Sequence, residues 1–267
     1  MIDETPCVKT QRRGSSSEIL YIVFSNPRAL NALTQDMQIR FIQLLEEAQK
    51  DKTVRAVVIR GDGDRAFSSG GSMDSLKQLT TEEACEAMYQ RGVDIREHIA
   101  AMDKPILAAV NGYCIGGGFE IAMCCDMIYA SDDASFGLTE VNIGLVPGWG
   151  GAIRLPRKIT VNKAKEMILL GERISAQEAA TQGIVNRIFP KDQLYAEVDK
   201  IVDRLIAKPP LAIRGIKAIV SHGIVDGNVE VAHEIEHKLS VWLMSTHDFQ
   251  EAVDAFQEKR PAHFEGR

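Results

Sequence analysis

Two glutamates, each close to a cluster of glycines, are the residues of this chain best suited to acid–base chemistry. Residues 116–118 are three consecutive glycines between two apolar runs, and Glu120 follows them. Glycine lets a backbone approach a ligand closely, and the helix expected here directs free N–H groups at that ligand. The turn therefore predicts an oxyanion site with a carboxylate beside it that can act as an acid or a base.

The second glutamate, Glu140, follows a short strand-like segment and precedes another glycine cluster at residues 148–151. Both glutamates lie in apolar, glycine-rich surroundings, where an unpaired charge is costly to bury. A triple glycine alone is also typical of a plain strand-to-helix crossover, and most glutamates lie on a solvated surface. That the two carboxylates share one site is therefore a hypothesis.

Four separated segments resemble the crotonase superfamily, which contains the enoyl-CoA hydratases and isomerases. They are residues 26–33, 65–71, 104–126 and 135–151, within a resemblance that runs from Ile19 to about Phe264. The resemblance implies an α/β fold built as a spiral of ββα units, with a core at residues 1–190 and a helical oligomerisation subdomain at residues 191–267. It also implies a homotrimer or a hexamer made of two trimers.

The resemblance is strongest to the enoyl-CoA hydratase branch, and it implies roles for four positions. Gly71 and Gly117 match the backbone N–H donors that hold the thioester oxygen of an acyl-CoA as it becomes an enolate. Glu120 and Glu140 match the two catalytic glutamates, and we expect Glu120 to act mainly on water and Glu140 mainly on the α-proton. Because the chain keeps both carboxylates, addition of water across the α,β double bond is the expected reaction.

Substrate-binding positions of the family also have counterparts here. The resemblance implies that Arg28 and the basic pair Lys259-Arg260 reach coenzyme A, the pair often across a subunit boundary, because a cation suits a phosphate. Surface cations are common, so a structural role for each stays open. The expected substrate-binding residues are Arg28, Ala29, Phe67, Gly70, Phe119, Gly148, Trp149 and Lys259.

Two positions depart from the family pattern. Trp149 stands where hydratases usually carry a small residue, so its indole would narrow the acyl pocket, stack on a ring-shaped substrate, or simply pack in the core. Ser72 stands where an acid is common, which leaves the orientation of that turn open. Phe119 borders the expected pocket, although a core position suits it better.

Three other functions remain as alternatives to the expected hydratase: an enoyl-CoA isomerase, a cyclic dienoyl-CoA hydratase and a non-catalytic RNA-binding relative.

Composition agrees with a soluble cytoplasmic protein. The 267 residues are 45% hydrophobic and 25% charged, and the formal net charge is −6. This acidic balance gives no general attraction for nucleic acid or an anionic membrane. Five cysteines without paired spacing favour reduced thiols. The acidic N-terminus has no apolar leader and no apolar run could span a membrane, so no membrane partner is expected.

One competing motif predicts a different chemistry. His233, Glu234 and His237 satisfy the H-E-x-x-H pattern of zinc proteases on an expected helix. The pattern is short, no obvious third ligand follows, and the neighbouring charges suit an exposed helix face. We therefore expect no metal and no cofactor, with coenzyme A present only as part of the substrate.

The elements that must position these residues alternate between strands and helices, as is typical of α/β proteins. Periodicity and capping residues predict strands at residues 19–24, 54–60 and 184–189. They predict helices at residues 35–50, 82–102, from Glu120 onward and at 176–182. From residue 191 the pattern is helical throughout, with helices at 194–207, 210–221, 229–244 and 249–257.

Overall fold

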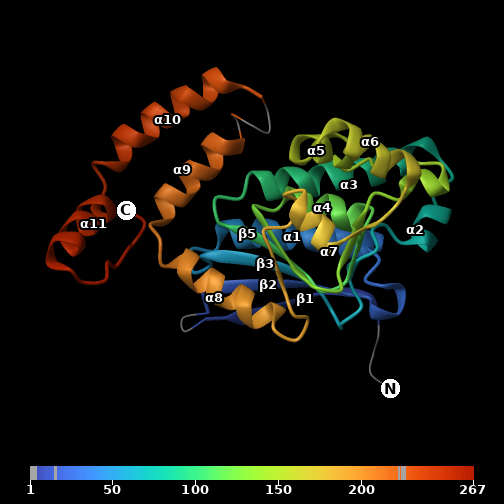
Figure 1. Cartoon of the computed structure of the whole chain (residues 1–267), viewed down its shortest axis with the longest axis horizontal. Coiled ribbons are helices and arrows are strands. Elements are labelled where there is room, and N and C mark those ends of the chain that lie inside the picture. Colours follow the sequence, from blue (N-terminus) through green and yellow to red (C-terminus); the bar gives the residue numbers. More distant parts are fainter. Residues whose placement is uncertain (1–4, 15–16, 222, 224–226) are drawn as a thin grey trace.

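Two β-sheets form the centre of the protein, and helices surround them (Figure 1). The computed structural model describes residues 5–14, 17–221, 223 and 227–267. The six-stranded sheet has the order β1 (Cys7–Arg13), β2 (Ile19–Ser25), β3 (Ala56–Gly61), β5 (Ile106–Val110), β7 (Met127–Ser131) and β10 (Arg187–Phe189). The four-stranded sheet has the order β4 (Ala66–Ser68), β6 (Tyr113–Ile115), β8 (Ser135–Gly137) and β9 (Ile174–Ser175).

The chain passes repeatedly from the large sheet to the small one and then into helix. β3 and β4 lead to α2 (Met73–Lys77) and α3 (Glu82–Ala100), and β5 and β6 lead to α4 (Gly117–Cys124). β7 and β8 lead to the 3₁₀ turn η2 (Glu140–Ile143), α5 (Gly151–Lys158) and α6 (Val161–Leu170). This repetition confirms the expected spiral of ββα units.

Both faces of the large sheet are buried, which explains why its central strands are apolar throughout. On β2, alternate residues face opposite sides: Leu20, Ile22 and Phe24 join one core, and Ile19, Tyr21 and Val23 join the other. The first core also contains α1 (Gln35–Lys50), which begins where the Thr34 hydroxyl accepts from the Met37 N–H. This helix start was predicted correctly.

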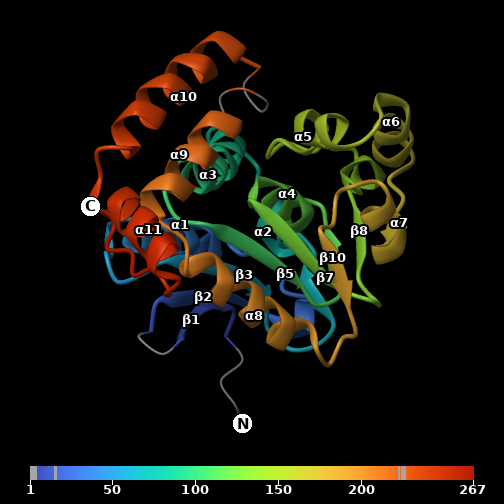
Figure 2. The ribbon, with the colours of Figure 1, turned by 60° about the vertical axis from the view of Figure 1, so that its left-hand side comes forward.

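The second core depends on α8 (Leu194–Ile206), which covers the opposite face of the large sheet (Figure 2). Leu194, Val198 and Val202 of α8 pack against β2, β3 and β5 residues. The expected boundary at residue 190 therefore does not coincide with a packing boundary, because α8 belongs with the sheet. Only the later helices lie to one side of it: α9 (Pro210–Val220), α10 (Val229–Leu243) and α11 (His247–Glu258).

Several elements differ from the prediction. The helix expected from Glu120 begins at Gly117, because Gly116 adopts a φ of 54° and lets the glycines form the first turn. The strand expected at 184–189 is reduced to β10, since Ile184 and Val185 enter the core instead. α7 (Ala176–Thr181) has the expected Ser175 cap, completed as a capping box with Glu178. Among the described residues, no helix is both long and apolar enough to cross a bilayer.

Candidate active site

Three segments with predicted site residues follow neighbouring parallel strands. β4, β6 and β8 are adjacent in the small sheet and run parallel, so their carboxyl ends reach the same edge. Gly70 and Gly71 follow β4, Gly117 follows β6, and Glu140 follows β8. The register of one small sheet therefore assembles residues that lie far apart in the sequence.

The glycine turns touch one another at this edge. A Cβ atom placed on Gly70, whose φ is 89°, would lie 2.8 Å from the Gly117 nitrogen. A Cβ atom on Gly116 would lie 3.3 Å from Oε1 of Glu140, and one on Gly151 would lie 2.9 Å from Oε1 of Glu120. Glycine at these positions leaves the room that the two carboxylates and the turns occupy.

The backbone N–H groups of Gly71 and Gly117 take no part in the hydrogen bonds that hold their turns. Gly71 forms a parallel bridge with Leu33. In this bridge the Leu33 N–H donates to the Gly70 carbonyl at 2.8 Å, and the Leu33 carbonyl accepts the Ser72 N–H at 3.0 Å. That pattern turns the N–H of Gly71 away from Leu33. Gly117 opens α4, so its N–H has no acceptor within the helix. Ser72 thus holds the turn through its backbone, although its side chain departs from the family pattern.

Glu120 is 3% exposed and is held by a neighbouring loop. Its Oε1 accepts the N–H of Trp149 at 2.8 Å and the N–H of Gly151 at 2.7 Å. Burial and the nearby charge of Glu140 raise the pKa of Glu120 to about 8, although these two N–H groups and Arg96 act in the opposite direction. Both of these hydrogen bonds end on Oε1, so Oε2 is the oxygen left for a water or a substrate.

Glu140 stands at the start of η2, and both its carboxylate oxygens are enclosed. No group among the described residues donates a hydrogen bond to either oxygen. Burial raises the pKa of Glu140. A buried polar group without a protein partner needs another explanation, and a substrate or a water at this position supplies one.

The raised pKa of Glu120 predicts a pH-dependent stability. An unfolded glutamate titrates near 4.3. Between this value and about 8 the folded protein binds the extra proton, so the free energy of unfolding falls as pH rises. Glu120→Gln removes this dependence. The free energy of unfolding of the variant minus that of wild type should rise by more than about 1 kcal/mol between pH 5 and pH 9. Chemical denaturation at the two pH values measures this difference.

A matched control is Glu166→Gln, which changes an exposed glutamate on α6. Its stability difference from wild type should not vary over the same pH range. A stability difference for Glu120→Gln that is equally constant would contradict the proton held by Glu120.

Trp149 packs in the core instead of facing a ring-shaped substrate. The residue is 5% exposed and belongs to the main apolar cluster. Its indole lies against two glycines: a Cβ on Gly117 would come within 2.8 Å of Cζ3, and a Cβ on Gly92 of α3 would overlap Cδ1 and Nε1. Of the three roles considered for Trp149, packing in the core agrees with this position. Its benzene ring supports the turn that carries the Gly117 N–H.

We expect Gly92→Ala to lower the free energy of unfolding by roughly 1–3 kcal/mol, because the added methyl group overpacks a rigid, buried contact. Urea denaturation of the variant measures this loss. Because leucine vacates the space of the indole, Gly92→Ala should lower the free energy of unfolding less in a Trp149→Leu background than in wild type. A single variant as stable as wild type would show that the contact adjusts without cost.

Two expected substrate-binding residues lie inside the core. Phe67 and Phe119 are both fully buried. The Phe67 ring packs edge-on against Phe24 at 5.8 Å between centroids, and the Phe119 ring lies 5.4 Å from Phe136. Their side chains therefore shape the elements behind the site and do not line it.

Three further predicted residues, Arg28, Ala29 and Gly148, lie near the glycine turns. Arg28 and Ala29 are exposed on the 3₁₀ turn η1 (Pro27–Ala29). This turn adjoins the glycine turn after β4, because the Ser69 hydroxyl donates to the Ala29 carbonyl at 3.1 Å. Gly148 is half-buried beside the Tyr89 ring of α3.

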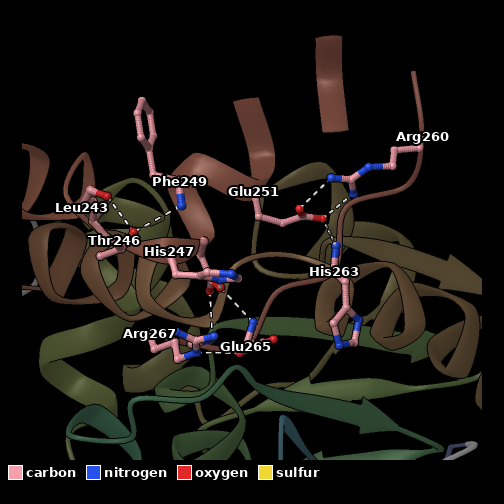
Figure 3. A network of polar contacts seen from close by, with 11 residues as sticks. Leu243, Thr246, His247, Phe249, Glu251, Arg260, His263, Glu265 and Arg267 are labelled. Atoms are coloured by element: carbon pink, nitrogen blue, oxygen red, sulfur yellow. Dashed lines mark hydrogen bonds and ion pairs between the residues drawn. The ribbon is translucent and has the colours of Figure 1, made fainter. Parts of the chain in front are cut away.

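Lys259 and Arg260 follow α11, which lies on the side of the molecule away from the small sheet (Figures 1 and 2). Arg260 donates to both oxygens of Glu251, at 2.6 and 2.8 Å (Figure 3). It also donates to Glu258 at 2.6 Å. This guanidinium therefore fastens the C-terminal tail. Lys259 is exposed and has a φ of 56°, and its contact with coenzyme A stays a prediction.

The H-E-x-x-H residues lie on the exposed surface of α10. In the part of the chain that the structure describes, no group of three or more histidine, cysteine, aspartate or glutamate side chains is arranged to hold a metal ion. His233 and His237 thus lack a third protein ligand among these residues.

A cavity beside Gly71 was not foreseen from the sequence. It has a volume of about 270 Å³ and lies between α1, α2 and α3. Its lining includes the apolar side chains of Leu76, Leu79 and Met88 and the polar side chains of Gln38 and Arg91. No short motif marks these residues, because they come from three helices that only the folded chain brings together.

Comparisons with known proteins show the family of this chain. Residues 14–267 match the family model for enoyl-CoA hydratase/isomerase. A crotonyl-CoA hydratase of Syntrophomonas wolfei is 37% identical over 92% of this chain and 93% of its own length. A 2,3-dehydroadipyl-CoA hydratase of Escherichia coli is 32% identical over 93% of this chain and 96% of its own length.

A solved structure gives the same result for the fold. The crystal structure of an enoyl-CoA hydratase from Bacillus anthracis has a TM-score of 0.92 and 29% sequence identity, and it covers 97% of this chain and 99% of that chain. With the family model matching nearly the whole sequence, this chain belongs to the enoyl-CoA hydratase/isomerase family.

Proposed function

We propose that this protein adds water reversibly across the α,β double bond of an acyl-CoA thioester. The observation that carries the proposal is the meeting of two buried carboxylates, Glu120 and Glu140, beside the glycine turns that carry the N–H groups of Gly71 and Gly117. Relatives named crotonyl-CoA hydratase and 2,3-dehydroadipyl-CoA hydratase support the reaction class. Their different names leave the acyl group open.

In the proposed reaction, the thioester oxygen accepts hydrogen bonds from the Gly71 and Gly117 N–H groups. Glu120 takes a proton from a water, and the water oxygen bonds to the β-carbon while the double-bond electrons move toward the thioester oxygen as an enolate. Glu140 then gives its proton to the α-carbon, and the enolate returns to a thioester. One proton shared by the two carboxylates suffices: it rests on Glu120, whose pKa is about 8, passes to Glu140 before the water is activated, and passes from Glu120 to Glu140 again after each turnover.

The protein environment suits this exchange of one proton. Burial raises the pKa of both carboxyl groups, and the charge of Glu140 raises the pKa of Glu120 further. Because coupled groups titrate as a pair, one of the two is protonated near neutral pH. Trp149 and Gly151 hold Oε1 of Glu120, which fixes the direction of Oε2. The pair can therefore supply a base and an acid at the same time.

The alternatives have less support. An isomerase moves one proton between two carbons and needs only one such group, whereas two carboxylates meet here. A cyclic dienoyl-CoA substrate was suggested by Trp149, whose indole packs in the core. An RNA-binding role conflicts with the net charge of −6.

The test is the loss of conjugated enoyl-thioester absorbance when the purified protein meets crotonyl-CoA. The expected product is the 3-hydroxyacyl-CoA, identified by mass spectrometry after a gain of one water. A 3-enoyl-CoA offered in parallel separates the alternatives: conversion of this substrate without hydration of crotonyl-CoA would replace the hydratase by an isomerase.

We also propose that the protein is an oligomer, a trimer or a hexamer. Apolar side chains are exposed along the C-terminal helices, including Trp242 at 48% and Phe256 at 86%. Such surfaces are common where subunits meet. Light scattering should give a mass three or six times that of the 29.5 kDa chain, and a monomer at micromolar concentration would contradict the proposal.

A further inference from the structure

The cavity beside Gly71 combines an apolar wall with a single charge. Leu76, Leu79 and Met88 supply apolar surface, and Gln38 and Arg91 supply polar groups. Within the described residues that line it, Arg91 is the only charged side chain. At about 270 Å³ the cavity falls just below the usual range for drug-sized ligands, ~300–1,000 Å³, so it fits a short acyl chain.

Arg91 is half-buried without an acidic partner among the described residues. Its Nε donates to Oε1 of Gln38 at 3.0 Å, and Gln38 is neutral. Burial lowers the pKa of Arg91, yet a guanidinium remains charged at neutral pH. A cation that loses water without gaining an anion is costly, and an arginine fork suits a carboxylate well. The side chain is therefore poised to accept an anion from outside the chain.

The position of Arg91 is tied to the glycine turn. Gln38, 2% exposed, donates from Nε2 to the Leu33 carbonyl at 3.2 Å. Leu33 is the bridge partner of Gly71, whose N–H is the proposed donor to the thioester oxygen. Two hydrogen-bonded steps thus connect the guanidinium to the backbone that holds the reacting end of the substrate. Because the guanidinium is held at a fixed distance from this backbone, it can select acyl chains by their length and by the charge at their far end.

We propose that Arg91 binds a second carboxylate at the far end of the acyl chain, so that the preferred substrates are short 2-enoyl-CoA thioesters of dicarboxylic acids. This inference rests on the proposed hydratase function. The proposal gives Arg91 the role of selecting the substrate by charge. The apolar lining of the cavity alone would accept an acyl chain without a second carboxylate as well.

The experiment compares matched thioesters that differ only at the chain end. The unsaturated pairs are 2-pentenoyl-CoA with 2-pentenedioyl-CoA and 2-hexenoyl-CoA with 2-hexenedioyl-CoA, assayed by kcat/KM. The saturated counterparts, hexanoyl-CoA and hexanedioyl-CoA, are titrated calorimetrically, since binding needs no turnover. The variants are Arg91→Met, which keeps much of the side-chain volume, and Arg91→Lys, which keeps the charge. Arg40→Met, which removes an exposed arginine from α1, is the control.

We expect wild type to prefer at least one dicarboxylic thioester about tenfold or more over its plain partner. Arg91→Met should lower kcat/KM and affinity for that thioester about 10–100-fold, and it should change both values for the matched monocarboxylic thioester less than about twofold. The losses in Arg91→Lys should lie between those of wild type and Arg91→Met. No preference in wild type, or an equal loss on both partners in Arg91→Met, would overturn the inference. If wild type hydrated none of the thioesters but still bound hexanedioyl-CoA more tightly than hexanoyl-CoA, the proposed function would be overturned and the role of Arg91 would stand.

Discussion

Glu120→Gln is expected to lower kcat for crotonyl-CoA hydration by about 10²–10⁴-fold, and Glu140→Gln by a similar factor. Glutamine keeps an oxygen that can accept the N–H groups of Trp149 and Gly151, so the loop that holds Glu120 should stay in place. What the variant loses is the capacity to take a proton from water. At position 140, glutamine cannot deliver the proton that the α-carbon requires.

Initial rates of absorbance loss measure these effects, and melting temperatures verify that the variants are folded. The control is again Glu166→Gln, which should keep the wild-type rate. Because the two carboxylates act as a unit, the double variant should lose much less than the product of the two single losses. Either single variant retaining more than about a tenth of the wild-type kcat would remove that glutamate from the proposed chemistry.

Gly70→Ala is expected to lower kcat by about 10²–10³-fold, the typical cost of losing one oxyanion donor. The new methyl group would lie 2.8 Å from the Gly117 nitrogen and 3.1 Å from the Ile115 carbonyl oxygen. Both are backbone atoms, so neither can rotate away. The turn would have to move, and the N–H groups of Gly71 and Gly117 would no longer point at one oxygen.

The matched control for this variant is Gly183→Ala, just beyond α7. Gly183 has a φ of 81°, close to the 89° of Gly70, but a Cβ there meets no atom within 4 Å. Both variants therefore carry similar backbone strain, and only one disturbs the glycine turns. If Gly183→Ala lowered kcat as much as Gly70→Ala, strain in the backbone, and not the oxyanion site, would explain the loss.

Local sequence determined much of the secondary structure. The amphipathic helix after Thr34 and the capping box at Ser175 lie where the residues predicted them, because a cap and a periodic apolar face involve only neighbours in the chain. Edge strand β1 was not predicted, since its exposed, charged residues lack the apolar pattern of a buried strand. Its place comes from antiparallel pairing with β2 along the full length.

The candidate site was only partly within reach of the sequence. Glycine clusters and two glutamates suggested an oxyanion site and acid–base chemistry, and the family resemblance suggested which positions to pair. The resemblance also suggested Phe67 and Phe119 as substrate-binding residues, and both lie in the core. Whether an aromatic side chain faces a ligand or the interior depends on which element covers it, and no local pattern contains that information.

Only the tertiary structure decided what lies beside what. β6 and β8 pair in register, Tyr113 with Ser135, and this pairing brings the segment that ends in Glu120 beside the segment that begins with Glu140. Packing of α3 against the loop after Pro147 set Trp149 on Gly92, and the meeting of three helices enclosed Arg91 in a cavity without an acid. The residue types, and so the chemistry that each side chain can perform, were fixed by the sequence itself. Their distances and their burial arise from contacts between segments far apart in the chain, and these contacts set the pKa values, the free N–H groups and the shape of the pocket.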